Sequence, residues 1–314
     1  MSRTSDSIFG VLDIIRFKDR VDFLNPKRSR RVKTPVMSQK HYKTTTMTVH
    51  NRTVCTIEPV ESAAESGPEA AGKTHIVFFH GGGYSMEASG LHFQLMKTLI
   101  KQTGCPLTYV DYPLAPEHTV TETIGMCFET YAKLLELHPT HRFVFVGDSA
   151  GGGLALALAM KIRDEGLVGP EQLILFSPWL DLTLSNEKIA SLEDRDVILG
   201  VAALQEIGER YCGDILKHHY LVSPKFGDLA GLGRIAVFYG TEEILYPDCR
   251  EFCETSAGAV DVADAQAGDA AGADAGVSVT GFEYKGMQHD WVLLPMEEAK
   301  KAIAEACELI RGGN

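Results

Sequence analysis

Short apolar runs alternate with helical stretches along most of this 314-residue chain. The runs are HIVFF at 75–79, PLTYVDY at 106–112, RFVFVG at 142–147, LILFSP at 173–178, RIAVFYG at 234–240 and SVTGFEY at 278–284. Between them, segments such as 91–102, 122–138 and 152–166 have the pattern of helices. This alternation predicts an α/β fold, in which a largely parallel sheet is covered by helices on both faces.

The ends of the chain add elements to this pattern. Apolar residues at helical spacing predict an amphipathic helix over 7–24, and the segments 42–50 and 52–60 read as a β-hairpin. The last helix, 296–313, ends in glycines that suit a helix C-cap.

Two segments interrupt the alternation. Residues 183–222 are mostly helical in pattern, and we expect them to form a lid together with the N-terminal helix. Residues 254–277 are a low-complexity stretch of Ala, Gly and Asp that buries little, so we expect a disordered surface loop.

Charge and cysteine content limit the class of protein. The 42 acidic and 30 basic side chains give a formal charge of −12, which argues against a nucleic acid or an anionic membrane as the main partner. The one basic stretch, 26–33, is predicted to be a solvated loop. The seven cysteines show neither a disulfide pattern nor metal-ligand spacing, and no apolar segment is long enough to span a membrane. We therefore expect a cytoplasmic monomer or homodimer.

The sequence GDSAG at 147–151 lies between a predicted strand and a predicted helix. This G-x-S-x-G pattern is typical of a nucleophile elbow, in which the serine occupies a strained turn whose neighbours leave no room for a Cβ. The following helix points its first N–H groups toward the reacting centre. Ser149 is therefore the predicted nucleophile, with Asp148 beside it in a supporting role.

Three glycines follow His80 at the end of the strand 75–79. An acyl-transfer enzyme must stabilise an oxyanion with N–H donors that are in place before the reaction. We expect the amides of Gly81, Gly82 and Ala150 to be these donors, and His80 to be a structural member of the loop. A phosphate-binding loop is the alternative, but neither of the usual glycine patterns for phosphate fits this stretch.

A serine nucleophile needs a base and an orienting carboxylate, which in α/β-hydrolases follow it in the order acid, histidine. His289 is the histidine that follows the last predicted strand. The acid should follow the strand 234–240, where Glu242, Glu243 and Asp248 are candidates that the strand pattern alone does not separate.

Five motifs together resemble the hormone-sensitive lipase family of α/β-hydrolases. They are HGGGY at 80–84, DYPLAPEH at 111–118, GDSAGGG at 147–153, SPWLDL at 177–182 and GMQHDW at 286–291. The resemblance covers roughly residues 70–295 and implies an eight-stranded, mostly parallel sheet with a small helical cap. It divides the chain into cap segments, 1–45 and 183–222, and core segments, 46–182 and 223–314. It also implies hydrolysis of carboxylic esters without a metal or organic cofactor.

The resemblance also favours particular residues. Ser149 and His289 match the nucleophile and the base, and Glu243 is the preferred acid because it opens a Glu-Ile-Leu stretch. Glu117 resembles a residue that braces the oxyanion loop from below. Candidates for the substrate pocket are the apolar residues next to the motifs, namely Tyr84, Trp179, Leu180 and Trp291.

The expected activity is that of a serine carboxylesterase acting on short- to medium-chain acyl esters of small molecules. The same triad would serve a deacetylase, a lactonase or an amidase, and the sequence does not separate these substrates. A non-catalytic small-molecule receptor on the same fold is the remaining alternative, and the presence of His289 argues against it.

Overall fold

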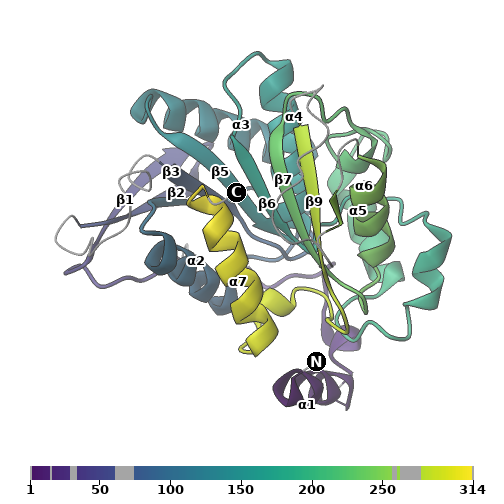
Figure 1. Ribbon diagram of the computed structural model, residues 1–314. Helices are drawn as coiled ribbons and strands as arrows, with labels where there is room; N and C mark the ends of the chain where they lie inside the picture. Colours follow the sequence, from purple (N-terminus) through teal and green to yellow (C-terminus); the bar gives the residue numbers. More distant parts are fainter. Residues whose placement is uncertain are drawn as a thin grey trace.

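A nine-stranded sheet runs through the centre of the protein in the computed structural model (Figure 1). The structure describes residues 2–14, 16–28, 34–60, 74–256, 260–261 and 277–312. The strands are β1 (Tyr42–Val49), β2 (Arg52–Pro59), β3 (Thr74–Phe79), β4 (Leu107–Val110), β5 (Arg142–Asp148), β6 (Gln172–Phe176), β7 (Gly233–Gly240), β8 (Val260–Asp261) and β9 (Val277–Tyr284). Their order across the sheet is β1-β2-β4-β3-β5-β6-β7-β9-β8.

All strand pairs from β4 to β8 are parallel, and β1 and β2 form an antiparallel hairpin that joins β4 at one edge. The predicted hairpin and the predicted parallel strands are therefore confirmed. Strand β8 contains only two residues, so the eight longer strands form the sheet that the family resemblance implied.

Helices cover both faces of the sheet. Helices α2 (Gly90–Thr103) and α7 (Glu297–Ile310) lie on one face, and α3 (Val120–Leu137), α4 (Ala150–Asp164) and α6 (Tyr246–Thr255) lie on the other (Figure 1). Alternate residues of β3 point into the two layers, with Ile76 and Phe78 toward α2 and Val77 and Phe79 toward α4. Because both faces are buried, the strand reads as a continuous apolar run in the sequence.

The N-terminal helix is shorter than its sequence pattern predicts. Helix α1 ends at Ile14, and a 3₁₀ turn at Phe17–Arg20 follows. The side chains of Ser2 and Ser5 donate hydrogen bonds to the carboxylate of Glu298 at 2.9 and 2.6 Å, so α1 is joined to the start of α7.

The segment 183–222 contains less helix than predicted. Its regular elements are a 3₁₀ turn at Glu187–Ser191 and helix α5 (Val201–Cys212), and turns make up most of the remainder. The apolar face of α5 joins the main core through residues such as Leu204, Ile207 and Tyr211.

Some predictions fall outside the described residues. They concern residues 29–33, which are most of the basic stretch 26–33, and residues 257–259 and 262–276, which are most of the Ala/Gly/Asp stretch. The predicted C-cap of the last helix is confirmed, because Gly312 has a φ of 89° just after α7.

All seven cysteines belong to the described part of the chain, where they are buried and form no disulfide. Among the described helices, none is long and apolar enough to cross a membrane.

Candidate active site

Ser149 lies in a sharp turn between β5 and α4. Its backbone has a φ of 51° and a ψ of −122°, a strained conformation for a residue with a side chain. Its amide donates to the carbonyl of Phe176 at 2.8 Å, and its own carbonyl accepts from the amide of Trp179 at 2.9 Å. These bonds to the end of β6 and the loop beyond it hold the turn in place.

The glycines around Ser149 are required by the close approach of other backbone atoms. A Cβ on Gly147 would lie 2.4 Å from the carbonyl oxygen of Gly151, and a Cβ on Gly151 would lie 2.2 Å from that of Phe79. These distances are too short for any side chain. The G-x-S-x-G spacing therefore has the steric cause that the sequence analysis gave it.

Three side chains form a hydrogen-bonded series at the carboxyl ends of the strands. The hydroxyl of Ser149 lies 2.9 Å from Nε2 of His289, and Nδ1 of His289 lies 2.6 Å from Oε2 of Glu243. All three residues are buried. The structure thus brings together the three residues that the sequence analysis singled out, with the carboxylate of Glu243 at Nδ1 of His289.

The second oxygen of Glu243 is held by two donors. Its Oε1 accepts a hydrogen bond from the amide of Gly240 at 2.7 Å and another from the hydroxyl of Ser177 at 2.8 Å. Because each carboxylate oxygen has its own partners, the orientation of Glu243 toward His289 is determined by the ends of β6 and β7.

Charged neighbours determine the protonation of His289. Burial disfavours the imidazolium, but the carboxylates of Asp290 and Glu243 outweigh this effect and raise the pKa of His289 well above its usual value. Oδ2 of Asp290 lies 3.2 Å from Nε2 of His289, on the side that faces Ser149. Burial raises the pKa of Asp290 to about 6.

The loop of glycines after β3 lies directly against Ser149. The position that a Cβ of Gly81 would occupy is 3.0 Å from Cβ of Ser149. Gly82 and Gly83 have φ values of 112° and 59°, which glycine tolerates best. The imidazole of His80 stacks on Tyr112 with ring centroids 4.4 Å apart, and its Nδ1 lies 2.7 Å from the carbonyl of Gly81.

Burial lowers the pKa of His80 to about 3, with a further contribution from nearby His92. His80 therefore stays neutral at ordinary pH, as a structural member of the loop would.

The prediction that the amide of Gly81 is an oxyanion donor is wrong in this geometry. That amide donates to Oδ2 of Asp148 at 3.0 Å and is therefore already engaged. The amides of Gly82, Gly83 and Ala150 have no acceptor among the described residues. The sequence could not show the bond to Asp148, because its two partners are 67 residues apart.

Asp148 is part of a buried chain of hydrogen bonds that the sequence analysis only partly foresaw. Its Oδ2 also accepts from Nε2 of His92 at 3.0 Å, and Nδ1 of His92 accepts from the amide of Ser89 at 2.9 Å. Ser89 and His92 form the capping box of α2. The start of α2 is thereby linked, through Asp148, to the glycine loop.

Comparison with known proteins places the chain in a family. The sequence model of a family described as having the α/β-hydrolase fold matches residues 76–293. The chain belongs to this α/β-hydrolase family.

Individual relatives indicate the branch of the family. The chain is 34% identical over 260 residues to an esterase of Acinetobacter venetianus, covering 80% of each chain, and 30% identical to an acetyl-hydrolase of Streptomyces hygroscopicus, covering 82% of this chain and 80% of that one. The crystal structure of a hormone-sensitive lipase homologue, EstE7 from a metagenome library, matches with a TM-score of 0.78 and 28% identity. That match covers 100% of this chain and 99% of the other. The resemblance to the hormone-sensitive lipase family is confirmed.

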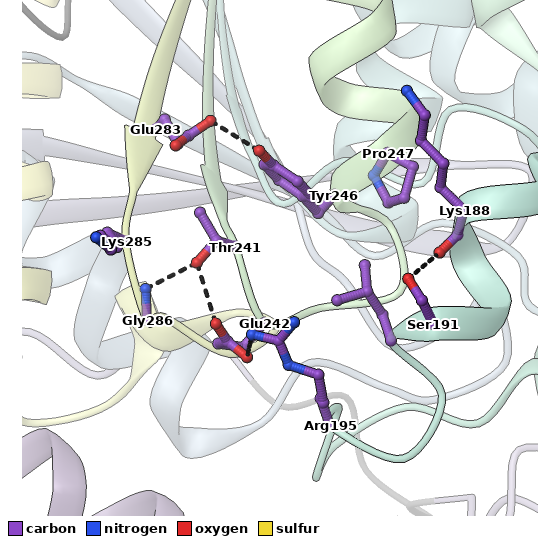
Figure 2. Close-up of a pocket in the computed structure, with 11 residues that line it drawn as sticks. Lys188, Ser191, Arg195, Thr241, Glu242, Tyr246, Pro247, Glu283, Lys285 and Gly286 are labelled. Atoms are coloured by element: carbon purple, nitrogen blue, oxygen red, sulfur yellow. Dashed lines mark hydrogen bonds and ion pairs between the residues drawn. The ribbon is translucent and has the colours of Figure 1, made fainter.

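Glu242, one of the alternative acids, has other partners than His289 in this α/β-hydrolase. It forms an ion pair with Arg195 and lies 3.3 Å from the hydroxyl of Thr241 (Figure 2). These side chains line a cavity of about 760 Å³, and Ser149, Glu243 and His289 are not among its lining residues. The other residues that line it are Lys188, Ser191, Leu192, Tyr246, Pro247, Glu283, Lys285 and Gly286.

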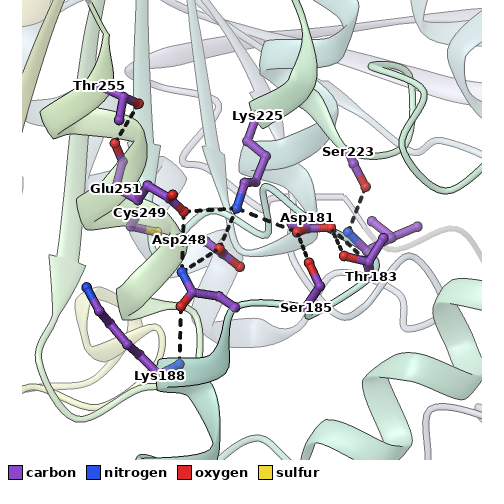
Figure 3. A network of polar contacts seen from close by, with 12 residues as sticks. Asp181, Thr183, Ser185, Lys188, Ser223, Lys225, Asp248, Cys249, Glu251 and Thr255 are labelled. Carbon is purple, nitrogen blue, oxygen red and sulfur yellow. Dashed lines mark hydrogen bonds and ion pairs between the residues drawn. The ribbon is translucent and has the colours of Figure 1, made fainter.

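Asp248, the other alternative, belongs to a separate network. Its Oδ1 lies 2.7 Å from Nζ of Lys225, which also lies 3.6 Å from Asp181 and 3.2 Å from Glu251 (Figure 3). The ammonium group thus joins the loop after β6 to the first and second turns of α6. Of the three candidate acids, Glu243 is the one whose carboxylate lies against Nδ1 of His289.

Glu117 does not brace the glycine loop directly, contrary to the prediction. It is about half exposed and forms an ion pair with Arg28 at 2.5 Å. Arg28 connects Glu117 to the residues after the glycines, because its guanidinium also donates to the carbonyls of Ser85 and Ala115. The hydrogen bond from Arg28 lowers the pKa of Glu117.

The four candidate pocket residues lie in the core. Tyr84, Trp179, Leu180 and Trp291 are each at most 1% exposed. Tyr84 stacks on Tyr211 with ring centroids 3.7 Å apart, and Trp291 packs against Tyr284 with the other helical layer. This burial does not support their prediction as substrate contacts.

A buried carboxylate that the sequence analysis missed joins the segment 195–199 to the residue after Glu243. Asp196 accepts hydrogen bonds from the amides of Ile198 and Leu199, both at 2.8 Å, and from the amide of Ile244 at 2.9 Å. The side chain of Gln288 bonds to the same segment, at Val197 and Arg195. Burial raises the pKa of Asp196 to about 6.

Proposed function

We propose that this protein is a serine carboxylesterase that works through an acyl-enzyme on Ser149. The observation that carries the proposal is the series from Ser149 through His289 to Glu243, with distances of 2.9 and 2.6 Å. The relatives named esterase and acetyl-hydrolase support hydrolysis of an ester bond.

In this mechanism Ser149 attacks the ester carbonyl while Nε2 of His289 takes the hydroxyl proton. The free amides of Gly82, Gly83 and Ala150 are the donors we propose for the oxyanion, in place of the engaged amide of Gly81. His289 then gives the proton to the leaving alcohol. Water repeats the sequence on the acyl-enzyme and releases the acid.

We propose that the N-terminal residues and the segment 183–222 together form the cap. The amine of Lys18 donates to the carbonyl of Glu193 at 2.5 Å, which connects the two segments. Phe23 lies against Gly83, at 2.9 Å from the position that a Cβ would occupy. A small cap over a mostly buried site suits short to medium acyl groups, and the relatives named acetyl-hydrolase favour the short end of this range.

The test is hydrolysis of p-nitrophenyl esters from acetate to dodecanoate by the wild type and by Ser149→Ala. Turnover should fall to background in the variant, and the rate of the wild type should be greatest for short chains. Turnover that persists in a folded Ser149→Ala protein would contradict the acyl-enzyme. An optimum at dodecanoate would contradict only the chain-length proposal.

Glu243→Gln provides a second test with a matched control. An amide cannot hold the imidazole tautomer or stabilise its positive charge, so kcat should fall by up to about 10⁴-fold. Glu242→Gln changes the neighbouring carboxylate, which pairs with Arg195, and should leave kcat within about threefold of the wild type. Equal losses in both variants would show that the loop, and not the bond to His289, matters.

A further inference from the structure

Three histidines lie together at the amino ends of the parallel strands, on the edge of the sheet opposite Ser149. His75 is the second residue of β3, His138 caps the end of α3, and His141 precedes β5. From His141 to Ser149 the chain runs eight residues along an extended strand, which separates the two sites by roughly 25 Å. The proposed esterase mechanism does not use these histidines.

The spacing of their nitrogens suits a metal ion. One ring nitrogen from each of the three histidines lies within 4.8 Å of the other two. Nδ1 of His75 and Nδ1 of His141 are 3.3 Å apart. A tetrahedral zinc ion with Zn–N bonds of about 2.0–2.1 Å holds its ligand nitrogens about 3.3–3.4 Å apart, so this pair is already at the required separation.

The second ring nitrogen of His75, Nε2, has a hydrogen-bond partner, as the second nitrogen of a metal-bound histidine usually does. Its Nε2 lies 2.8 Å from the hydroxyl of Thr108, which lies 2.8 Å from the hydroxyl of Thr56. When Nε2–H donates along this chain, Nδ1 carries a lone pair directed at His141. A hydrogen bond of this kind orients the ring and increases the basicity of the ligating nitrogen.

The cluster combines one buried histidine with two partly exposed ones. His75 is fully buried and lies in β3, which pairs with β5 in parallel register. His138 and His141 are partly exposed and lie in the turn between α3 and β5, so a cation can enter from solvent. His138 stacks on His141 with ring centroids 4.6 Å apart and an interplanar angle of 16°, so its ring must turn, and its nitrogen must approach by at most about 1.5 Å, to complete the set.

The nearby charges do not oppose a cation. The carboxylate of Glu58 is close enough to raise the pKa of His141, although burial and His138 lower it overall. The guanidinium of Arg142 is engaged elsewhere, by Thr74, the carbonyl of Ile310 and the carboxylate of Glu171.

We propose that His75, His138 and His141 bind a divalent transition-metal ion, with zinc as the expected metal and water in the fourth position. Imidazole ligands and a tetrahedral arrangement are typical of zinc sites. The site would join β3, β5 and the end of α3 at the amino edge of the sheet. Its function would be structural, because it is remote from Ser149.

The experiment is calorimetric titration of chelator-treated, full-length protein with Zn²⁺, together with Co²⁺ as a spectroscopic probe of geometry. We expect one equivalent to bind, Co²⁺ to give the intense visible absorption of a four-coordinate site, and the melting temperature to rise with added Zn²⁺. Hydrolysis of p-nitrophenyl acetate should be the same with and without the metal.

Variants of the two partly exposed ligands avoid disturbing the core. His138→Gln and His141→Gln should each weaken Zn²⁺ binding by more than the roughly 10- to 100-fold that loss of a supporting partner costs. Thr108→Val, which removes the partner of Nε2 of His75, should weaken it within that range. His50→Gln, a surface histidine paired with Glu129, is the control and should bind like the wild type.

Binding that survives in the double variant His138→Gln/His141→Gln would place the metal elsewhere and overturn the proposal. No binding by the folded wild-type protein would also overturn it, and would leave a plain N–H···N hydrogen bond between His75 and His141 as the reason for their contact.

Discussion

Asp290 is the residue that most changes the chemistry expected of His289. Its carboxylate lies 3.2 Å from Nε2, the nitrogen that accepts the proton of Ser149 in the proposed mechanism, and it stabilises the protonated imidazole. A general base works only when it is unprotonated, so the raised pKa of His289 should limit activity at acidic and neutral pH.

Asp290→Asn should therefore shift the acidic limb of the kcat/KM profile to lower pH. Removal of the anion destabilises the imidazolium and lowers the pKa of His289, so the base stays unprotonated at lower pH. The effect depends on an ionised Asp290, whose pKa is about 6, and should be greatest above that pH. The measurement is the pH dependence of kcat/KM for p-nitrophenyl acetate.

Asp6→Asn, at an exposed position of α1, is the control for a change in net charge and should not move this limb. A limb that stays in place in Asp290→Asn, or that moves to higher pH, would refute the role given to Asp290.

At the scale of elements, Lys225 joins parts of the chain that are far apart in sequence. Its ammonium group is largely buried between Asp181, beyond β6, and the carboxylates of Asp248 and Glu251 on α6. Nearby carboxylates raise the pKa of Lys225 despite its burial, and burial raises the pKa of Asp248 despite the ion pair. The network therefore stabilises the strand ends that carry Ser177 and Glu243.

Lys225→Ala should lower the free energy of unfolding at neutral pH by about 3 kcal/mol, because it leaves buried carboxylates without a counter-charge. Without the ammonium group the folded-state pKa of Asp248 rises further above its unfolded value. The loss is therefore present above that pKa and shrinks as the pH falls through it. Urea unfolding followed by tryptophan fluorescence at neutral and acidic pH measures both effects.

Lys300→Ala removes a fully solvated ion pair with Glu297 and should change the stability little. If Lys225→Ala were no more destabilised than this control, the network would not have the importance given to it here.

At the scale of the whole molecule, the sheet holds two groups of polar residues at opposite edges. The triad lies at the carboxyl ends of β5, β7 and β9, and the three histidines lie at the amino ends of β3 and β5. The wide separation is why metal binding and ester hydrolysis should be independent. The sequence analysis expected no metal, because it considered cysteine spacing and not a cluster formed by His75 with the distant His138 and His141.

Local patterns in the sequence were sufficient for much of the fold and for the order of the triad. The apolar runs predicted the central strands because both faces of those strands are buried, and the glycines at 147 and 151 predicted the elbow because backbone atoms approach them closely. The errors concern bonds between distant residues. The amide of Gly81 is taken by Asp148, and Arg28 connects Glu117 to the carbonyl of Ser85, just after the glycines. No local pattern could indicate either contact.

The most direct test of the central claim is labelling of the nucleophile with diethyl p-nitrophenyl phosphate. The serine oxygen attacks phosphorus while His289 takes the hydroxyl proton, p-nitrophenolate leaves, and the protein gains one diethylphosphoryl group. We predict one label per chain, located on Ser149 by peptide mass spectrometry, with loss of esterase activity in proportion and no label on Ser149→Ala. Labelling of another residue that abolishes activity, or full activity in a protein labelled on Ser149, would contradict the account.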